Sequence, residues 1–294
     1  MAKQSKVKTT PKAKARSTPK AKARSRARAR LIDEMTARLV GLGQSALALP
    51  ESDPVRKLGL SWYPAARTWI DSLAERWSAY GATSRAIAGA VAALSPQCSW
   101  LDQTRFLPGF LESVLVDRDW LTLPHPGFLR NRERACRMLL GAEPSALLSG
   151  PKVTAFFSAI MGDSSRAVID RHAATLALGE RRRFMKDWLV ASIQEAYARA
   201  AGELGIEPRD LQSLLWCMHK ASGAAEEHEQ ATFFEVGGRI QELGLGWADD
   251  PLEAFTAPAW SLPDPDPEAP NLEKTTVREG TVSKDGEDSN YAPF

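Results

Sequence analysis

The chain has 294 residues, of which 44% are hydrophobic, and a formal net charge of +2, so it is long enough to bury one large core or two small ones. No apolar run approaches the roughly eighteen residues of a membrane-spanning helix, and no apolar segment typical of a secretory signal stands at the N-terminus, which predicts a cytoplasmic protein with no membrane contact. The three scattered cysteines and four histidines lack ligand spacing, so we expect no disulfide framework, no metal and no cofactor.

The small net charge conceals a strongly basic first segment. Residues 1–30 hold twelve of the 38 Lys and Arg residues and no acidic residue, and they contain the octapeptide TPKAKARS at 10–17 and again at 18–25. Because this segment has no apolar face to bury, we expect residues 1–30 to form a disordered tail that binds the phosphate backbone of DNA. A tail that serves only solubility or localisation is the alternative.

Helical patterns fill the central part of the chain. Apolar residues recur at spacings of three and four, and no segment alternates as a strand would, which predicts an all-α domain over residues 31–257. Residues 258–294 hold eight acidic and three basic residues and are expected to form a disordered acidic tail. The predicted helices cover residues 31–47, 64–80, 83–94, 103–116, 129–140, 152–161, 171–178, 186–203, 208–220 and 226–243.

The strongest chemical signal is the pair Lys152 and Asp170, which lie eighteen positions apart. Lys152 follows Gly150 and Pro151 at the expected start of a helix, where free backbone N–H groups attract a phosphate. Asp170 ends an apolar run and precedes another helix, so the two side chains can face one cleft. An ordinary N-cap is the alternative for Asp170, since Asp caps helices well without any catalytic role.

Two further segments carry polar residues suited to DNA. Gln97 follows an apolar helix, where its side chain can fill the space that an extruded base leaves; an ordinary helix-terminating loop is the alternative. Asn131 stands among Arg130, Arg132 and Arg134 on one predicted helix. That helix is either a DNA contact or a solvated basic face.

Taken in chain order, these segments resemble the helix-hairpin-helix DNA glycosylase superfamily over roughly residues 83–178. The resemblance implies an all-α glycosylase-like fold that flips a base into a pocket beside a catalytic aspartate. The chain departs from the family at the hairpin, where residues 146–150 contain a single glycine. The segments that carry the resemblance are Leu94-Ser95-Pro96-Gln97, Asn131-Arg132-Glu133-Arg134-Ala135, Ser149-Gly150-Pro151-Lys152 and Ile169-Asp170-Arg171-His172.

The chain also resembles, in more detail, small phage proteins that are similar to these glycosylases. Such proteins are proposed to join an amino acid or a polyamine to an activated 5-hydroxymethyluracil in DNA. The resemblance therefore implies a transferase. It rests on Gly150-Pro151-Lys152-Val153, Gly162-Asp163, Asp170, Ala196-Tyr197 and Leu211-Gln212-Ser213-Leu214-Leu215-Trp216.

Together the resemblances imply an enzyme of phage thymidine hypermodification and restriction evasion. It would transfer a small amine or an amino acid, glycine being the simplest, to 5-phosphomethyl-deoxyuridine in double-stranded DNA. Asp170 would be the general base or cation stabiliser, while Lys152, Arg171 and the helix start at Gly150 would receive the leaving phosphate. His172 would relay a proton, or is a buried structural histidine.

Gln97, Asn131 and Arg132 would contact the DNA or the base in this reading. Two other functions stay open at this point. The chain can be a DNA glycosylase or abasic-site lyase that excises a base. It can also be a non-catalytic DNA-binding or packaging protein, which the TPKAKARS repeats favour.

Overall fold

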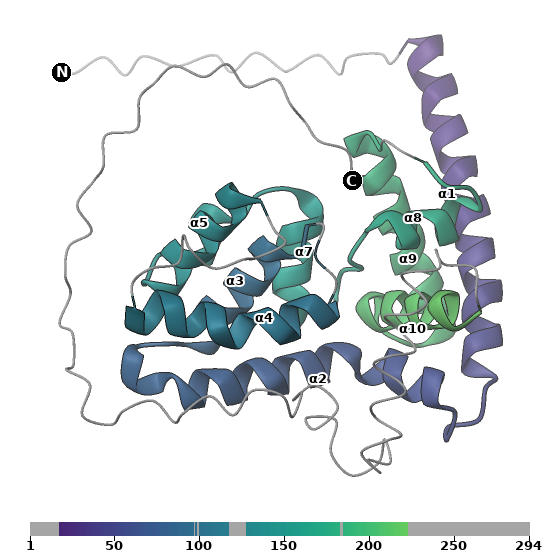
Figure 1. Cartoon of the computed structure of the whole chain (residues 1–294). Coiled ribbons are helices and arrows are strands. Elements are labelled where there is room, and N and C mark those ends of the chain that lie inside the picture. Colours follow the sequence, from purple (N-terminus) through teal and green to yellow (C-terminus); the bar gives the residue numbers. More distant parts are fainter. Residues whose placement is uncertain (1–17, 97, 99, 118–127, 183–184, 223–294) are drawn as a thin grey trace, which may run out of the picture.

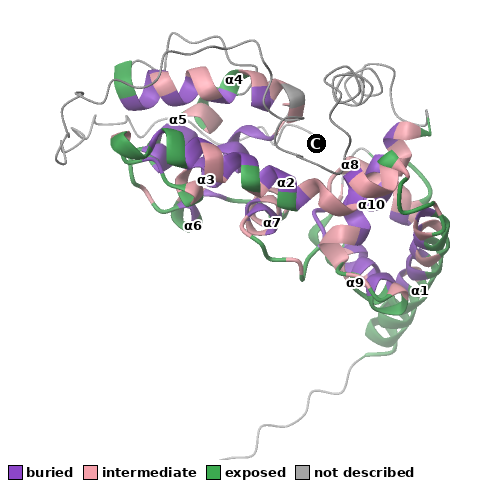
Figure 2. Cartoon of the chain, turned by 90° about the horizontal axis from the view of Figure 1, so that it is seen from below, coloured by how far each residue is buried: buried purple, intermediate pink, exposed green. Residues whose placement is uncertain are grey.

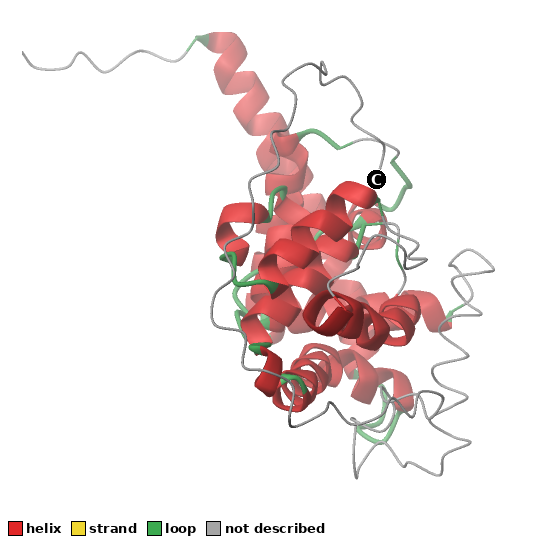
Figure 3. Ribbon diagram, turned by 60° about the vertical axis from the view of Figure 1, so that its left-hand side comes forward, coloured by secondary structure: helices red, strands yellow, loops and turns green. Residues whose placement is uncertain are grey.

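The protein is helical throughout the part of the chain that the structure describes. A computed structural model describes residues 18–222 except 97, 99, 118–127 and 183–184, and every regular element in those ranges is a helix or a helical turn (Figures 1 and 3). The predicted all-α class is confirmed for these residues. The elements are α1 (Pro19–Leu47), α2 (Pro54–Arg76), η1 (Ser78–Tyr80), α3 (Ser84–Leu94), α4 (Trp100–Glu112), the π-helical η2 (Ser113–Asp117), α5 (Leu129–Leu139), α6 (Pro144–Leu147), α7 (Pro151–Ile160), α8 (Arg171–Leu178), α9 (Asp187–Leu204) and α10 (Pro208–Ala221).

The N-terminal helix α1 is longer than predicted. It begins at Pro19, so the expectation of disorder over residues 1–30 is wrong for residues 19–30. The Thr18 side chain accepts a hydrogen bond from the backbone N–H of Ala21 at 3.3 Å and caps the helix. Ala, Lys and Arg are good helix formers, and the segment continues a helix whose later turns are packed, so no separate nucleus is needed.

Helix α2 also begins earlier than the pattern indicated. The prediction took Pro64 as a helix start, whereas the helix begins at Pro54 and Pro64 lies inside it. The Asp53 carboxylate caps the true start by accepting hydrogen bonds from the backbone N–H groups of Val55 and Arg56, at 2.9 and 3.1 Å. Packing of the first half of α2 against α10 compensates for the internal proline.

Most other boundaries fall within a few residues of the prediction, and the short helix α6 was not predicted. Residues 1–17, the predicted helix 226–243 and the predicted acidic tail 258–294 lie outside the described residues.

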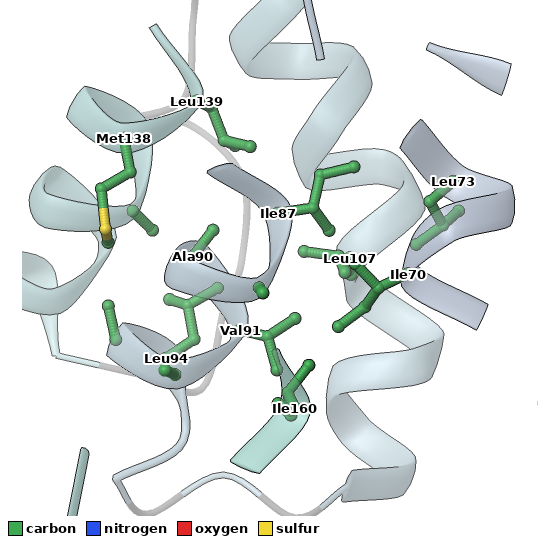
Figure 4. Close-up of a cluster of buried hydrophobic side chains, with 14 of the residues drawn as sticks. Ile70, Leu73, Ile87, Ala90, Val91, Leu94, Leu107, Met138, Leu139 and Ile160 are labelled. Atoms are coloured by element: carbon green, nitrogen blue, oxygen red, sulfur yellow. The ribbon is translucent and has the colours of Figure 1, made fainter. Parts of the chain in front are cut away.

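Buried side chains form two clusters. The first surrounds α3, in which residues 87–94 are all buried, and helices α2, α4, α5 and α7 pack around it (Figure 4). The second cluster joins α1, α8, α9 and α10 around the fully buried Tyr197. Helix α2 belongs to the first cluster and also packs along α10, so the two clusters meet at this pair of helices.

The contact between α2 and α10 depends on a glycine. A Cβ atom at Gly59 would lie 2.6 Å from the Leu214 Cα atom, which is closer than real Cβ contacts. At the same place the Ser213 hydroxyl donates a 2.6 Å hydrogen bond to the Gly59 carbonyl oxygen. The two backbones therefore approach as closely as they do because position 59 has no side chain.

Gly59→Ala is expected to lower the free energy of unfolding by about 1–3 kcal/mol, because a backbone atom blocks the added methyl group. Gly41→Ala is the matched control, since Gly41 is also helical and nothing lies within 4 Å of its would-be Cβ atom. The control should gain about 0.5–1 kcal/mol from its better helix propensity. Urea unfolding of both variants measures the difference, and equal effects would contradict the close approach.

Candidate functional site

A cavity of about 140 Å³, partly open to solvent, lies where the two clusters meet. An engineered protein cavity of about 150 Å³ holds a benzene molecule, so this cavity has room for one six-membered ring. Its wall comes from α2, the segment between α3 and α4, the start of α4, α7, the residues before α8, and α10. The lining residues are Trp62, Tyr63, Ser95, Cys98, Trp100, Gln103, Lys152, Phe156, Val168, Asp170, Gln212, Ser213 and Trp216.

Aromatic side chains form a large part of this wall. The Trp62 ring lies 5.4 Å from the Trp100 ring and 5.3 Å from the Trp216 ring, measured between centroids. Phe156 extends the group, at 6.4 Å from Trp100 and 6.3 Å from Tyr63. Aromatic faces of this kind can stack on any planar nucleic-acid base.

Asp170 lines the cavity and caps α8 at the same time. Its Oδ1 atom accepts a 2.7 Å hydrogen bond from the backbone N–H of Ala173, so the N-cap interpretation is correct. A carboxylate has two oxygens and several lone pairs. The cap uses one oxygen, and the other has no hydrogen-bond partner among the described residues, which leaves it for a ligand.

The charge of Asp170 also acts on two buried tyrosines. Burial first, and then the negative charge of Asp170, raise the pKa of both Tyr63 and Tyr197 above the ordinary value for tyrosine. Both phenols therefore stay protonated and donate, Tyr63 to the Gln212 Oε1 atom at 2.9 Å and Tyr197 to the Ala173 carbonyl oxygen at 3.2 Å. The bond from Tyr63 orients the Gln212 amide so that its nitrogen is the group left to face a ligand.

Lys152 reaches the cavity from the first turn of α7. Gly150 is the N-cap and has a positive φ of 88°, and Pro151 occupies the first helical position. The first turn of a helix offers backbone N–H groups without intrahelical partners, and these favour an anion. No ion pair joins Lys152 to Asp170 within the described ranges, so the two charges stand on one cavity wall without neutralising each other.

Gln103 is a cavity residue with a buried polar atom that no described residue satisfies. Its side chain is only 3% exposed, and its Oε1 atom has no hydrogen bond from any residue that the structure describes. A buried acceptor of this kind is costly unless something donates to it. Gln103 therefore places an unsatisfied acceptor within the wall of the cavity.

The structure brings together only part of the predicted site. Lys152 and Asp170 share the cavity, and Gly150 holds the start of the Lys152 helix. Arg171 and His172 open α8 but do not line the cavity. The His172 ring lies 5.3 Å from the His219 ring.

The remaining predicted residues lie elsewhere. Asn131 and Arg132 lie in the first turn of α5, away from the cavity wall, and Gln97 lies outside the described residues. The sequence reasoning missed Trp62, Trp100 and Gln103. Nine tryptophans in one chain were a signal of an aromatic site, but not of its location.

Cys98 lines the cavity but is poorly suited to act as a nucleophile. Burial, assisted by the nearby charge of Asp102, raises the pKa of the Cys98 thiol to about 12. A thiol reacts as its thiolate, so Cys98 is almost entirely in the unreactive form at neutral pH.

Iodoacetamide should therefore leave Cys98 unmodified in the native protein between about pH 7 and pH 9, because the thiolate forms only as the pH approaches the raised pKa. Cys136 and Cys217 are buried and should be protected too. In denaturant all three cysteines should react. Peptide mass mapping gives the measurement, and rapid labelling of native Cys98 would contradict the raised pKa.

The described residues contain no group of three or more His, Cys, Asp or Glu side chains that could hold a metal ion. Among the same residues no helix is long and apolar enough to span a membrane.

The described residues form an all-helical fold with an aromatic cavity whose described lining includes Lys152 and Asp170. A family model described as a family of unknown function (DUF7178) matches residues 24–223, and the chain belongs to this family. Neither a curated protein nor a solved structure matches the chain.

Proposed function

We propose that the protein is a phage DNA base-modifying transferase that binds an extrahelical 5-phosphomethyluracil in this cavity and joins an amino acid to it. The observation that carries the proposal is the position of Lys152 and Asp170 on one aromatic wall around a space of single-ring size. Flipping a base out of duplex DNA costs a few kcal/mol. Stacking on tryptophan offsets about 1–3 kcal/mol of this cost.

The reaction is a displacement at the methylene carbon attached to C5 of the uracil. The amine nitrogen of the amino acid forms a bond to this carbon, and the bond from carbon to the phosphate oxygen breaks, with its electron pair leaving on the phosphate. Asp170 accepts the proton that the amine loses. Lys152 and the N–H groups at the start of α7 stabilise the departing phosphate.

Gln103 and Gln212 suit the recognition of the base in this proposal. A uracil ring has an N3–H donor between two carbonyl oxygens. Gln103 offers a buried acceptor, and Gln212 offers the amide nitrogen that Tyr63 leaves unused. The N3–H group would donate to Gln103, and a uracil oxygen would accept from Gln212.

Base excision is the second candidate, and the place of Lys152 beside Asp170 favours it too. In that case the Lys152 amine would attack C1′ of the sugar and form a Schiff base after the base leaves. The two functions differ in where the new bond forms, at the exocyclic methylene carbon or at the sugar.

One incubation separates them. The full chain is mixed with duplex DNA containing 5-phosphomethyl-deoxyuridine and with an amino-acid mixture, and the DNA is digested to nucleosides and weighed by mass spectrometry. A nucleoside whose mass equals that of the 5-phosphomethyl nucleoside plus one amino acid minus one phosphoric acid supports transfer. Strand nicks after alkali, or a borohydride-trapped complex, support excision, and the absence of both products overturns both proposals.

A further inference from the structure

The N-terminal part of α1 is a helical arm with an unusual arrangement of charge. Residues 18–30 are all exposed, as the green colour of this part of α1 in Figure 2 indicates, and Figures 1 and 3 show it extending beyond the body of the protein. It carries six cations and no acidic residue. The six are Lys20, Lys22, Arg24, Arg26, Arg28 and Arg30.

These cations form two stripes on opposite sides of the helix. Residues four apart lie on one face of an α-helix, whereas residues two apart are separated by about 200°. Lys20, Arg24 and Arg28 therefore form an inner stripe. Lys22, Arg26 and Arg30 form an outer stripe on the other side, and small residues, chiefly Ala, separate the two stripes.

One contact fixes the orientation of the arm. The Arg28 Nε atom donates a 2.9 Å hydrogen bond to the Ser192 hydroxyl in α9. The inner stripe therefore lies, at Arg28, on the side of α1 that faces α9. The outer stripe consequently faces away from α9. The other five cations make no ion pair or side-chain hydrogen bond with a described residue, so their charges are available to a partner.

We propose that this arm lies in the major groove of duplex DNA, with one stripe on the phosphates of each strand. The major groove is about 12 Å wide, and a helix with its side chains is about 10–12 Å across. Cations on opposite sides can then contact both walls, while the small side chains between them allow the helix to enter. Because the helix is already formed, binding does not have to order the segment.

The chemistry of the arm argues against a membrane surface as its partner. A helix that lies on a membrane needs large apolar side chains opposite its cations. Residues 19–30 contain only Pro, Ala, Ser, Lys and Arg. Charge complementarity therefore favours a polyanion with two parallel rows of phosphates.

The test measures binding of the full chain to a short duplex of ordinary nucleotides at several salt concentrations. Replacing the outer stripe, as Lys22→Ala with Arg26→Ala and Arg30→Ala, should reduce the slope of log affinity against log salt by about three times 0.9. Exchanging the cations within the same stripe, as Lys22→Arg with Arg26→Lys and Arg30→Lys, is the matched control and should keep the slope. An unchanged slope in the Ala variant overturns the proposal.

A second variant tests the helix itself. Ala21→Gly, Ala23→Gly, Ala27→Gly and Ala29→Gly keep every charge but remove helix propensity, each by about 1 kcal/mol. We expect a fall in affinity of about tenfold or more, with helix loss seen by circular dichroism and an unchanged melting temperature of the body. Unchanged affinity would show that unstructured cations suffice, which overturns binding by a preformed helix.

Chemical footprinting locates the groove. Bound protein should protect guanine N7 in the major groove from dimethyl sulfate, and protection of adenine N3 in the minor groove instead would overturn the assignment. None of these measurements requires the transfer reaction or a modified base. The inference therefore stands or fails separately from the proposed function.

Discussion

Asp170→Asn is expected to lower product formation by about 10²- to 10⁴-fold, the usual contribution of a general base, without weakening the fold. The substitution separates the helix cap that the structure shows from the proposed role of Asp170 as general base. Asn caps helices as well as Asp does, so the bond from the Ala173 N–H group is kept. Only the negative charge and the ability to accept a proton are lost.

Asp53→Asn is the matched control for this variant. Asp53 also caps a helix through its Oδ1 atom, at the start of α2, and it does not line the cavity. It should leave turnover unchanged. Turnover is measured by nucleoside mass spectrometry, and thermal unfolding confirms that both variants are folded. An Asp170→Asn protein as active as the control would remove Asp170 from the chemistry and leave it as a cap alone.

The amino-acid sequence predicts the helices well because their signal is local. Apolar spacing and capping residues determined α3, α7, α8 and α10 to within a residue or two. The error at residues 19–30 arose because the lack of an apolar face was taken as disorder. The packed turns that follow in α1 provide a formed helix from which the basic segment can continue, whereas an isolated basic segment would have to nucleate its own helix.

The candidate site was only partly predictable, for a physical reason. Lys152 and Asp170 belong to one continuous segment, so their spacing was enough to propose a shared cleft. Trp62, Trp100 and Trp216 come from three helices that are distant in sequence, and only tertiary packing brings their rings together. No local pattern indicates such a meeting.

Gln103 illustrates the same limit for a polar residue. The pattern placed residue 103 at the start of a helix, where glutamine is usually exposed. In the structure α4 begins at Trp100, and Gln103 is buried in the cavity wall with its acceptor unsatisfied. Its burial follows from the packing of α4 against α2 and α3, which the local sequence does not encode.

Substitution of Lys152 is expected to cause a second large loss of turnover. Comparing two substitutions shows whether Lys152 binds the phosphate or attacks the sugar. Lys152→Ala should reduce turnover by about 10²- to 10³-fold, as the loss of a charge-stabilising donor does at other active sites. Lys152→Arg keeps a positive charge and binds phosphate well, but a guanidinium stays protonated and cannot form a Schiff base. The transfer proposal therefore expects the Arg variant to keep much of the activity that the Ala variant loses.

The excision mechanism makes the opposite prediction for the same two proteins. If the Lys152 amine attacks the sugar, Arg and Ala variants should be equally inactive, and only the wild type should be trapped on DNA by borohydride. Lys57→Ala is the control, since Lys57 lies in α2 outside the cavity and should not affect either readout. Because Lys152 lies at the start of α7 with no salt bridge to Asp170, its side chain is available to bind a phosphate through its charge or to attack a sugar as the neutral amine, and the Arg variant distinguishes these roles.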